Sequence, residues 1–384
     1  METVFGRMSM AYRVIRRTFG VRVLPLFAGM YWATVRFWVT VGMAIDPLLF
    51  GKLRRTEVRK PIVLVGNPRT GTTFLQRFMC DQGYGAGVEV YRMLFPSLLI
   101  QTLLKPFLPA LEVIAPTRWH KTKAHDTSLQ SVETDDVAVL FRHFDGFFLY
   151  GFFLAFDEED HEKQFTPEVR DTSARDFDWL EQVWRRSLVA HDHDVVIAKL
   201  FSLSTRLPQF IERFPEARIL FMARDPLSTI PSGMSLVTGV LDKAFGFWSL
   251  PPEVRSRWFE RLYSGLVELQ KRFHDDYVSG RIPKDRVFVV RYDRMMSDFD
   301  GLMDDMHAFL GHEPTEAQRQ AIAEQAEKQR AYKSEHKYDL AKFELDEERI
   351  RRDSQDFYDT FLPPLEAGQP AKAGARAEAA EGSA

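Results

Sequence analysis

The sequence of 384 residues predicts an α/β fold in three layers, with a central parallel β-sheet flanked by helices. Several short β-branched runs occur in the body of the chain, and each is followed by turn residues and then by a helical pattern. Most of these runs are almost free of charge, as expected of strands that are covered on both faces. The predicted strands are residues 62–65, 88–91, 195–198, 219–222 and 287–291.

Composition divides the chain into three segments. Residues 1–59 form a basic and apolar extension that we predict to be helical, and residues 60–362 contain the alternation of strands and helices. Residues 363–384 lack aromatic side chains and are rich in Ala, Gly, Pro and Glu, so we predict a disordered tail. The function is therefore expected in the segment 60–362.

The charge balance excludes some classes of partner. The 51 Lys and Arg residues are opposed by 54 Asp and Glu residues, giving a formal net charge of −3, so no nucleic-acid partner is expected. Cys80 is the only cysteine, which excludes an intrachain disulfide and a cysteine-based zinc cluster. A single thiol fits a cytoplasmic protein.

The first 60 residues are unlike the rest, with eleven basic and three acidic side chains. Arg36 and Asp46 divide the apolar stretch 23–51 into uncharged runs shorter than the roughly 20 residues that a membrane-spanning helix needs. Two interpretations remain open. The segment makes peripheral contact with the membrane in its plane, with aromatic side chains such as Trp32 and Trp38 at headgroup depth, or it is a helical hairpin packed on the protein itself.

The first predicted strand leads into a turn that is typical of phosphate-binding loops. Gly66 and Gly71 have the spacing G-x-x-x-x-G, and the following residues read as a helix, whose N-terminus would attract an anion. Where nucleoside triphosphatases carry a lysine, this chain has Thr72, followed by Thr73, and the cation of the loop is Arg69. Such a loop can hold one terminal oxyanion but is poorly equipped for a magnesium triphosphate.

A second candidate anion site follows the strand 219–222. Arg224 stands at its carboxyl end, Asp225 can cap a helix that begins at Pro226, and Ser232 lies about two turns further along. The alternative is that Arg224 and Asp225 form only a surface ion pair. Two anion sites at strand ends indicate a ligand that is phosphorylated at two positions.

Together, the motifs Pro68-Arg69-Thr70-Gly71-Thr72-Thr73 and Arg224-Asp225-Pro226…Ser232 resemble the two phosphate sites of PAPS-dependent sulfotransferases, in particular the divergent bacterial-type branch of P-loop sulfotransferases. The resemblance covers residues 60–362, with Lys199 at a strand end and the segments 289–292 and 336–340 in matching order. It implies a P-loop-type domain.

The resemblance also implies transfer of a sulfuryl group from 3′-phosphoadenosine 5′-phosphosulfate (PAPS) to an acceptor hydroxyl or amine, without a metal. Arg69 occupies the position of the family's loop cation and would stabilise the leaving group. The 5′-phosphate end would be held by Thr70, Gly71, Thr72 and Thr73, and the 3′-phosphate by Arg224 and Ser232.

The general base has two candidates, His125 and Glu133, because this branch tends to keep a histidine and, some eight residues later, a carboxylate. A histidine titrates close to neutral pH and can accept the acceptor's proton directly. A partly buried glutamate with a raised pKa could do the same. The run of alternating His and Asp at 191–194 is predicted to be a solvated turn and not a metal site.

The acceptor must be inferred from composition. The aromatic run 144–156 and the apolar segment 94–115 favour a hydrophobic small-molecule or lipid alcohol, although an ordinary core explains them equally well. We therefore predict a cytoplasmic sulfotransferase that works at the inner face of the membrane. The rival hypotheses are a degenerate P-loop kinase and a non-catalytic membrane-associated nucleotide-binding protein.

Overall fold

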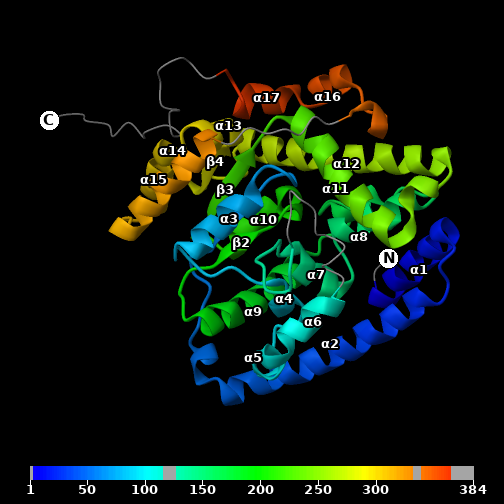
Figure 1. The fold of residues 1–384 in the computed structure, drawn as a ribbon, viewed down its shortest axis with the longest axis horizontal. Helices are drawn as coiled ribbons and strands as arrows, with labels where there is room; N and C mark the ends of the chain where they lie inside the picture. Colours follow the sequence, from blue (N-terminus) through cyan, green and yellow to red (C-terminus); the bar gives the residue numbers. More distant parts are fainter. Residues whose placement is uncertain (1–2, 116–126, 332–338, 365–384) are drawn as a thin grey trace.

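In the computed structural model the chain folds around a fully parallel sheet of four strands in the order β2-β1-β3-β4 (Figure 1). The structure describes residues 3–115, 127–331 and 339–364, so nearly all of the predicted tail 363–384 lies outside the described residues. The strands are β1 (Ile62–Val65), β2 (Ile197–Lys199), β3 (Arg218–Ala223) and β4 (Val287–Arg291).

Four of the five predicted strands are present, and the prediction of a strand at 88–91 is wrong. There the chain makes isolated bridges from Ala86 and Glu89 and then enters a short helix. The amides of Val90 and Tyr91 donate hydrogen bonds to carbonyl groups of the loop 129–131 instead of a sheet strand. The apolar side chains of this run are buried all the same, so composition alone could not distinguish the two outcomes.

The described helices account for most of the chain. Those before β2 are α1 (Val4–Phe19), α2 (Leu24–Leu49), α3 (Thr72–Asp81), α4 (Val90–Leu94), α5 (Leu98–Leu104), α6 (Leu108–Ile114), α7 (Asp136–His143), α8 (Phe147–Phe152) and α9 (Ser173–His191). Those after β2 are α10 (Leu207–Arg213), α11 (Pro226–Phe245), α12 (Pro252–Val278), α13 (Tyr292–Ser297), α14 (Phe299–Leu310), α15 (Glu316–Ala331), α16 (Glu347–Asp353) and α17 (Gln355–Phe361). The 3₁₀ turns η4 (Leu154–Phe156), η5 (Glu162–Phe165) and η6 (Ser202–Thr205) connect them.

Helices cover both faces of the sheet, which confirms the predicted three layers. Alternate strand residues point to opposite faces, so Val63 and Val65 belong to one core whereas Ile62 and Leu64 belong to the other. The first core packs against α9, α10, α12 and α17, and the second against α3, α13, α14 and α15. Because the four strands are parallel, their carboxyl ends lie at one edge of the sheet, and the helices that follow the strands begin near that edge.

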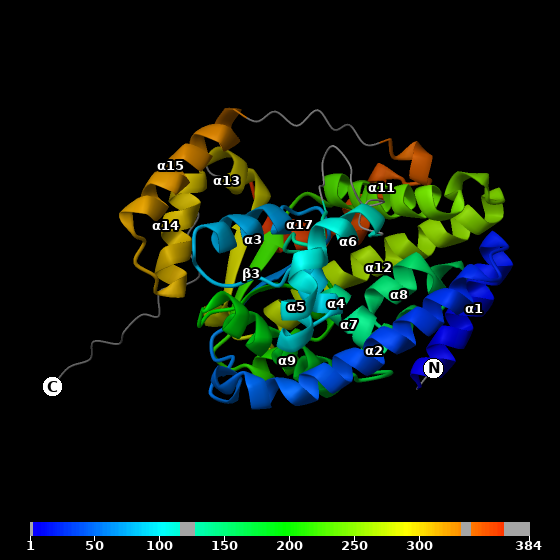
Figure 2. The same cartoon turned by 60° about the horizontal axis from the view of Figure 1, so that its bottom comes forward.

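The N-terminal extension is a helical hairpin. Residues Ala11 and Val14 of α1 join a separate core with η4, α11 and α12, and Val39 of α2 joins the main core. Figure 2 shows α2 running along the outside of the body beside α1 and α5. Trp32, which the membrane interpretation placed at headgroup depth, instead donates a hydrogen bond from Nε1 to the Phe141 carbonyl. Within the described residues, no helix is long and apolar enough to span a bilayer.

The buried carboxylate of Asp46 holds α2 against the body. It accepts a hydrogen bond from Nε of Arg186 on α9 at 2.8 Å, and both side chains are buried. It also accepts from the Ser97 hydroxyl and from the first amides of α5, so it caps that helix as well. Burial lowers the pKa of Arg186, and Asp46 opposes this change.

We expect Asp46→Asn to destabilise the fold strongly, because it leaves the Arg186 guanidinium buried without its counter-charge. Breaking a buried ion pair in this way costs about 3–5 kcal/mol of unfolding free energy. Urea denaturation followed by circular dichroism measures the loss. The control is Asp192→Asn, which removes an exposed carboxylate paired with Lys52 and should leave the midpoint unchanged. Equal midpoints for the two variants would contradict this role of Asp46.

Candidate active site

The loop between β1 and α3 has the geometry of an anion-binding turn. Gly66 and Gly71 have φ values of 139° and 94°, which favour glycine, and a Cβ on Gly66 would lie 2.8 Å from the Met222 carbonyl oxygen. Gly71 is the N-cap of α3, so the first amides of that helix point into the turn. Arg69 also has a positive φ, of 74°. The backbone is thus shaped to present its N–H groups to a ligand.

Hydrogen bonds within the protein fix the loop in this shape. The buried Thr70 hydroxyl donates to the Asn67 carbonyl at 2.8 Å, so this side chain closes the turn and leaves ligand binding to its amide. The Asn67 amide group donates to the Leu266 carbonyl of α12 at 2.9 Å. Sequence analysis did not single out Asn67, since its partner lies far away along the chain.

The second predicted anion site lies directly against this loop. Arg224 donates from Nη1 to the Arg69 carbonyl at 2.8 Å, and Arg69 donates from Nε to the Ser232 hydroxyl at 2.9 Å. The Arg224 guanidinium is stacked on the ring of Tyr292, with Cζ 3.8 Å from the ring centre. The two arginines therefore belong to one site, and Tyr292, the last residue of the segment 289–292 that the resemblance included, is their neighbour.

Asp225 has the predicted role of helix cap, in place of the alternative that it forms only a surface ion pair with Arg224. Its carboxylate accepts a hydrogen bond from the Leu227 amide at 2.9 Å, and Pro226 begins α11. The helix continues through Pro231 to Phe245, which brings Ser232 to the loop from the second turn. Pro231 leaves the carbonyl of a first-turn residue without its helical donor, a small loss so close to the start of a helix.

Lys199 adds a third cation at the carboxyl end of β2. Its side chain is almost completely buried, and Nζ donates to the Thr73 hydroxyl at 2.9 Å and to Glu133 at 3.4 Å. Burial lowers the pKa of Lys199, and the carboxylate of Glu133 opposes this change. Strand-end position was the only sequence signal for Lys199.

Glu133 lies between two cations. It accepts a hydrogen bond from Nη2 of Arg77 on α3 at 2.8 Å and from the Thr127 hydroxyl at 3.3 Å, in addition to its contact with Lys199. Of the two predicted general bases, Glu133 is thus placed beside the loop, whereas His125 lies outside the described residues. The segment 336–338 of the resemblance lies outside them too.

Two neighbouring carboxylates attach the segment of Glu133 to β2. Asp135 is fully buried and accepts hydrogen bonds from the Lys199 amide and from the Trp184 indole at 2.9 and 2.8 Å. Burial raises the pKa of Asp135 to about 7, and these hydrogen bonds limit the rise. Asp136 accepts from the Phe201 amide at 2.7 Å. These contacts hold the loop that carries Glu133 at the carboxyl end of β2.

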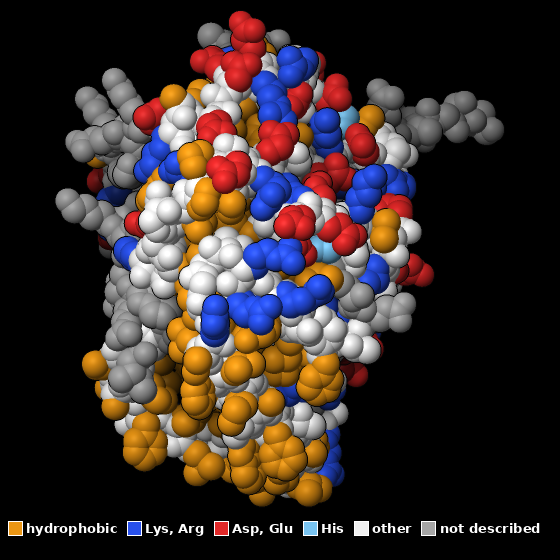
Figure 3. Space-filling model, turned by 90° about the vertical axis from the view of Figure 1, so that its right-hand side faces the viewer, with side chains coloured by type: hydrophobic (Ala, Val, Ile, Leu, Met, Phe, Trp, Pro, Cys, Tyr) orange, Lys and Arg blue, Asp and Glu red, His pale blue; other side chains and the backbone are white. Residues whose placement is uncertain are grey.

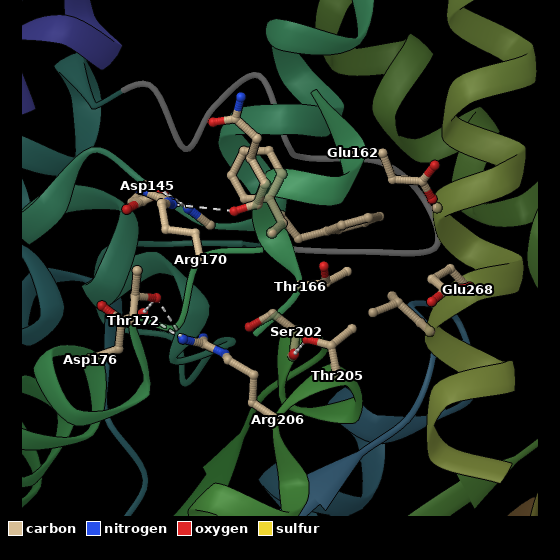
Figure 4. Close-up of a pocket in the computed structure, with 16 residues that line it drawn as sticks. Asp145, Glu162, Thr166, Arg170, Thr172, Asp176, Ser202, Thr205, Arg206 and Glu268 are labelled. Carbon is tan, nitrogen blue, oxygen red and sulfur yellow. Dashed lines mark hydrogen bonds and ion pairs between the residues drawn. The ribbon is translucent and has the colours of Figure 1, made fainter. Parts of the chain in front are cut away.

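A cavity that is open to solvent lies between α12 and the segments around η5 and η6, and no residue of the two loops lines it (Figure 4). Gly265 and Leu269 of α12 line it, and both lie within one turn of Leu266, whose carbonyl accepts the hydrogen bond from Asn67. Ser202, which follows shortly after β2, also lines it. Figure 4 shows Asp145 and Arg170 on one side and Glu162 and Glu268 on the other. Burial, together with Asp160 and Glu268, raises the pKa of Glu162 to about 7.

The aromatic run 144–156 contributes less to this cavity than expected. Phe147 lines it, but Tyr150 and Phe156 are buried in the core with Trp258. The apolar segment 94–115 does not line it and packs around α2 and α4 instead. The histidines of the run 191–194 lie at the end of α9, and the described residues contain no cluster of His, Cys, Asp and Glu suited to a metal ion.

Comparison with known proteins gives a consistent result. The model of the Sulfotransferase family matches residues 61–316. Omega-hydroxy-beta-dihydromenaquinone-9 sulfotransferase Stf3 of Mycobacterium tuberculosis is 23% identical over 260 residues, which is 65% of this chain and 62% of that protein, and the Mycobacterium bovis protein matches to the same extent. The aligned part is thus less than two thirds of these relatives.

Two solved structures share the fold. Sulfotransferase STF1 from Mycobacterium tuberculosis H37Rv has a TM-score of 0.68 at 14% identity, covering 91% of this chain and 90% of that one. Sulfotransferase STF9 from Mycobacterium avium has a TM-score of 0.61 at 16% identity, covering 84% and 82%. The family match contains the sheet, the loops that follow β1 and β3, and α12, and the chain belongs to the Sulfotransferase family.

Proposed function

We propose that this protein transfers a sulfuryl group from PAPS to a hydroxyl or amine of an acceptor. The observation that carries the proposal is the contact between the two loops, in which Arg69 reaches Ser232 and Arg224 reaches the Arg69 backbone. PAPS carries a phosphosulfate on the 5′ side and a phosphate on the 3′ side of one ribose. Two anion sites that touch each other suit such a ligand, because its two charged ends are only a few bonds apart.

The roles of the residues follow from their placement. The amides of residues 70–73 and the N-terminus of α3 would hold the 5′-phosphate, and Arg224 with Ser232 would hold the 3′-phosphate. Arg69 and the buried Lys199 lie on either side of the loop and would stabilise negative charge on the departing phosphate oxygen. These side chains supply cationic charge that a divalent ion provides in triphosphatases, and we propose a reaction without a metal.

The proposed reaction is a single in-line displacement. The acceptor oxygen attacks the sulfur, the bond between sulfur and the bridging phosphate oxygen breaks, and the acceptor proton moves to the general base. The products are a sulfate ester and adenosine 3′,5′-bisphosphate. Binding both partners in one orientation lowers the barrier by removing translational and rotational freedom.

We assign the general base to His125 and a positioning role to Glu133. The support for this assignment is that the Glu133 carboxylate already accepts hydrogen bonds from Arg77, Lys199 and Thr127, which occupy its lone pairs. Glu133 would then keep Lys199 charged and directed at Thr73.

For the acceptor we propose a hydrophobic alcohol. The mycobacterial relative is named for an omega-hydroxy-dihydromenaquinone, and in this chain Phe147, Phe165 and Leu269 give the neighbouring cavity an apolar portion. An acceptor of this class dissolves in a bilayer. The proposal therefore extends to an enzyme that works in the cytoplasm at the inner face of the membrane.

The assignment of the 3′-phosphate site predicts a selective loss of affinity. Arg224→Ala should weaken binding of adenosine 3′,5′-bisphosphate by about 10- to 100-fold, as expected for loss of a charged hydrogen bond. It should weaken binding of 5′-AMP less, because that ligand lacks the 3′-phosphate and is affected only through the contact of Arg224 with the Arg69 carbonyl. Isothermal titration calorimetry in EDTA measures both ligands. A requirement for magnesium and preference for ATP would support a kinase instead, and equal losses for both nucleotides would contradict the assignment.

The assignment of Arg69 predicts a loss of rate. Arg69→Gln should lower kcat by about 10²–10³-fold, because a preorganised donor to the leaving group is lost, with a smaller effect on nucleotide affinity. Arg69→Lys should recover part of the rate, since it retains the charge. Turnover of labelled PAPS with a panel of alcohols measures kcat. A loss confined to nucleotide affinity would show that Arg69 only binds the cofactor, and no turnover by the wild type would leave a non-catalytic binding protein.

The assignment of the base predicts the pH dependence of kcat. A histidine base is active when neutral, so activity should rise with pH through a value near the ordinary histidine pKa of about 6.5. This acidic limb should persist in Glu133→Gln and disappear in His125→Gln. Profiles of kcat between about pH 4.5 and about pH 8.5, which is about two units on either side of that pKa, distinguish the two. The opposite pattern would make Glu133 the base.

A further inference from the structure

The solvent-exposed side of α2 is uncharged over its whole length and mostly apolar, and the hydroxyls of its exposed Thr34 and Thr40 donate to carbonyls of the helix itself. All residues from 23 to 49 are described, and none of the exposed ones is charged, since Arg36 is half-buried and Asp46 is buried. The exposed large side chains near its start and middle each have 54–67% of their surface accessible, and they are Val23, Leu24, Leu26, Phe27, Met30, Tyr31, Phe37 and Trp38. A surface helix normally has its charged residues on this side.

The helix is held in this orientation by its opposite side. Asp46 pairs with Arg186, the Trp32 indole donates to the Phe141 carbonyl, and Arg142 donates to the Thr40 hydroxyl at 2.9 Å. Val39 contributes to the core of the sheet domain. The apolar side is therefore presented outward by a packed helix, and rotating the helix to bury it would break these contacts.

Neighbouring segments extend the apolar surface. Leu103 and Phe107, each 62% exposed, and Val113 belong to the segment of α5 and α6, and α5 packs along α2. Figure 3 shows hydrophobic side chains gathered over the lower part of the molecule, with Lys and Arg side chains along their upper margin. Contiguous apolar surfaces of this extent mark sites of interaction.

Basic side chains occupy both ends of α2. Arg13 and Arg16 of α1 and Arg22 of the loop are exposed before it, and Arg54 and Arg55 are exposed after it. An apolar helix bordered by basic residues complements a bilayer with anionic headgroups. A second copy of the chain is a poorer partner, because pairing of two such faces in either direction would bring basic ends together.

We propose that the surface formed by the exposed side of α2 with Leu103, Phe107 and Val113 docks in the plane of an anionic lipid bilayer, without crossing it. The apolar side chains would enter the boundary between headgroups and acyl chains, and the arginines at both ends of α2 would contact the lipid phosphates. Docking would place the enzyme where a hydrophobic acceptor is dissolved. Vesicle binding needs no turnover, so the inference can be tested independently of the proposed sulfotransfer.

The test measures flotation of the full-length protein with phosphatidylcholine vesicles that contain or lack phosphatidylglycerol. We expect binding to the anionic vesicles that weakens with salt. The variant Phe27→Glu/Tyr31→Glu should lower binding by at least tenfold, because two apolar anchors are replaced by charges that the lipid repels. Neutralising Arg13, Arg16 and Arg22 with Gln should also lower it by tenfold or more on anionic vesicles, from about 1 kcal/mol per basic residue.

The matched control is Val169→Glu/Val278→Glu, which places two charges at apolar positions that are 60% and 55% exposed and lie outside α1, α2, α5 and α6. It should bind vesicles as the wild type does. Affinity for adenosine 3′,5′-bisphosphate should be equal in all variants, which verifies folding. Equal flotation of the Phe27/Tyr31 and control variants, or no flotation of the wild type, would overturn the proposal. A wild-type dimer in sedimentation that dissociates in the Phe27/Tyr31 variant would assign this surface to a second copy.

Discussion

The site depends on the parallel pairing of β1 with β3. This register places Val65 beside Phe221, so the loops that follow the two strands leave the sheet side by side. The result is a pair of direct contacts, from Arg224 to the Arg69 backbone and from Arg69 to Ser232. A change of register by one residue would move the two loops apart and turn their side chains to opposite faces. The anion-binding geometry is thus a property of the sheet and needs no separate folding unit.

Cationic side chains gather around the first turns of α3. They are Arg69, Arg77, Arg224 and Lys199, and the carboxylate of Glu133 contacts two of them, Arg77 and Lys199. Burial lowers the pKa of Lys199 because the protein environment favours its neutral form. A polyanion in the loop would oppose this lowering of the pKa of Lys199.

Sequence reasoning succeeded where the signal was local. The loop from Gly66 to Thr73 and the cap at Asp225 depend on adjacent residues, and both are present as predicted. It failed at 88–91, where β-branched residues pair with a loop, because strand formation depends on a partner that a single segment does not specify. It also missed the roles of Asn67 and Arg77, whose partners are distant in the chain. The aromatic run near Phe147 was ambiguous because core and cavity walls have the same composition.

The contacts of Asp46 make the first 50 residues an integral part of the fold. The same carboxylate neutralises Arg186 and begins α5, and Val39, about two turns earlier in α2, covers the sheet core. Proteolytic or genetic removal of this segment would therefore leave a buried guanidinium uncompensated and expose apolar surface of the sheet domain. A truncated chain would aggregate for reasons unrelated to lipid. To prepare the protein without lipid for crystallisation or assay, point substitutions of the outward-facing side chains of α2 in the intact chain are preferable to truncation.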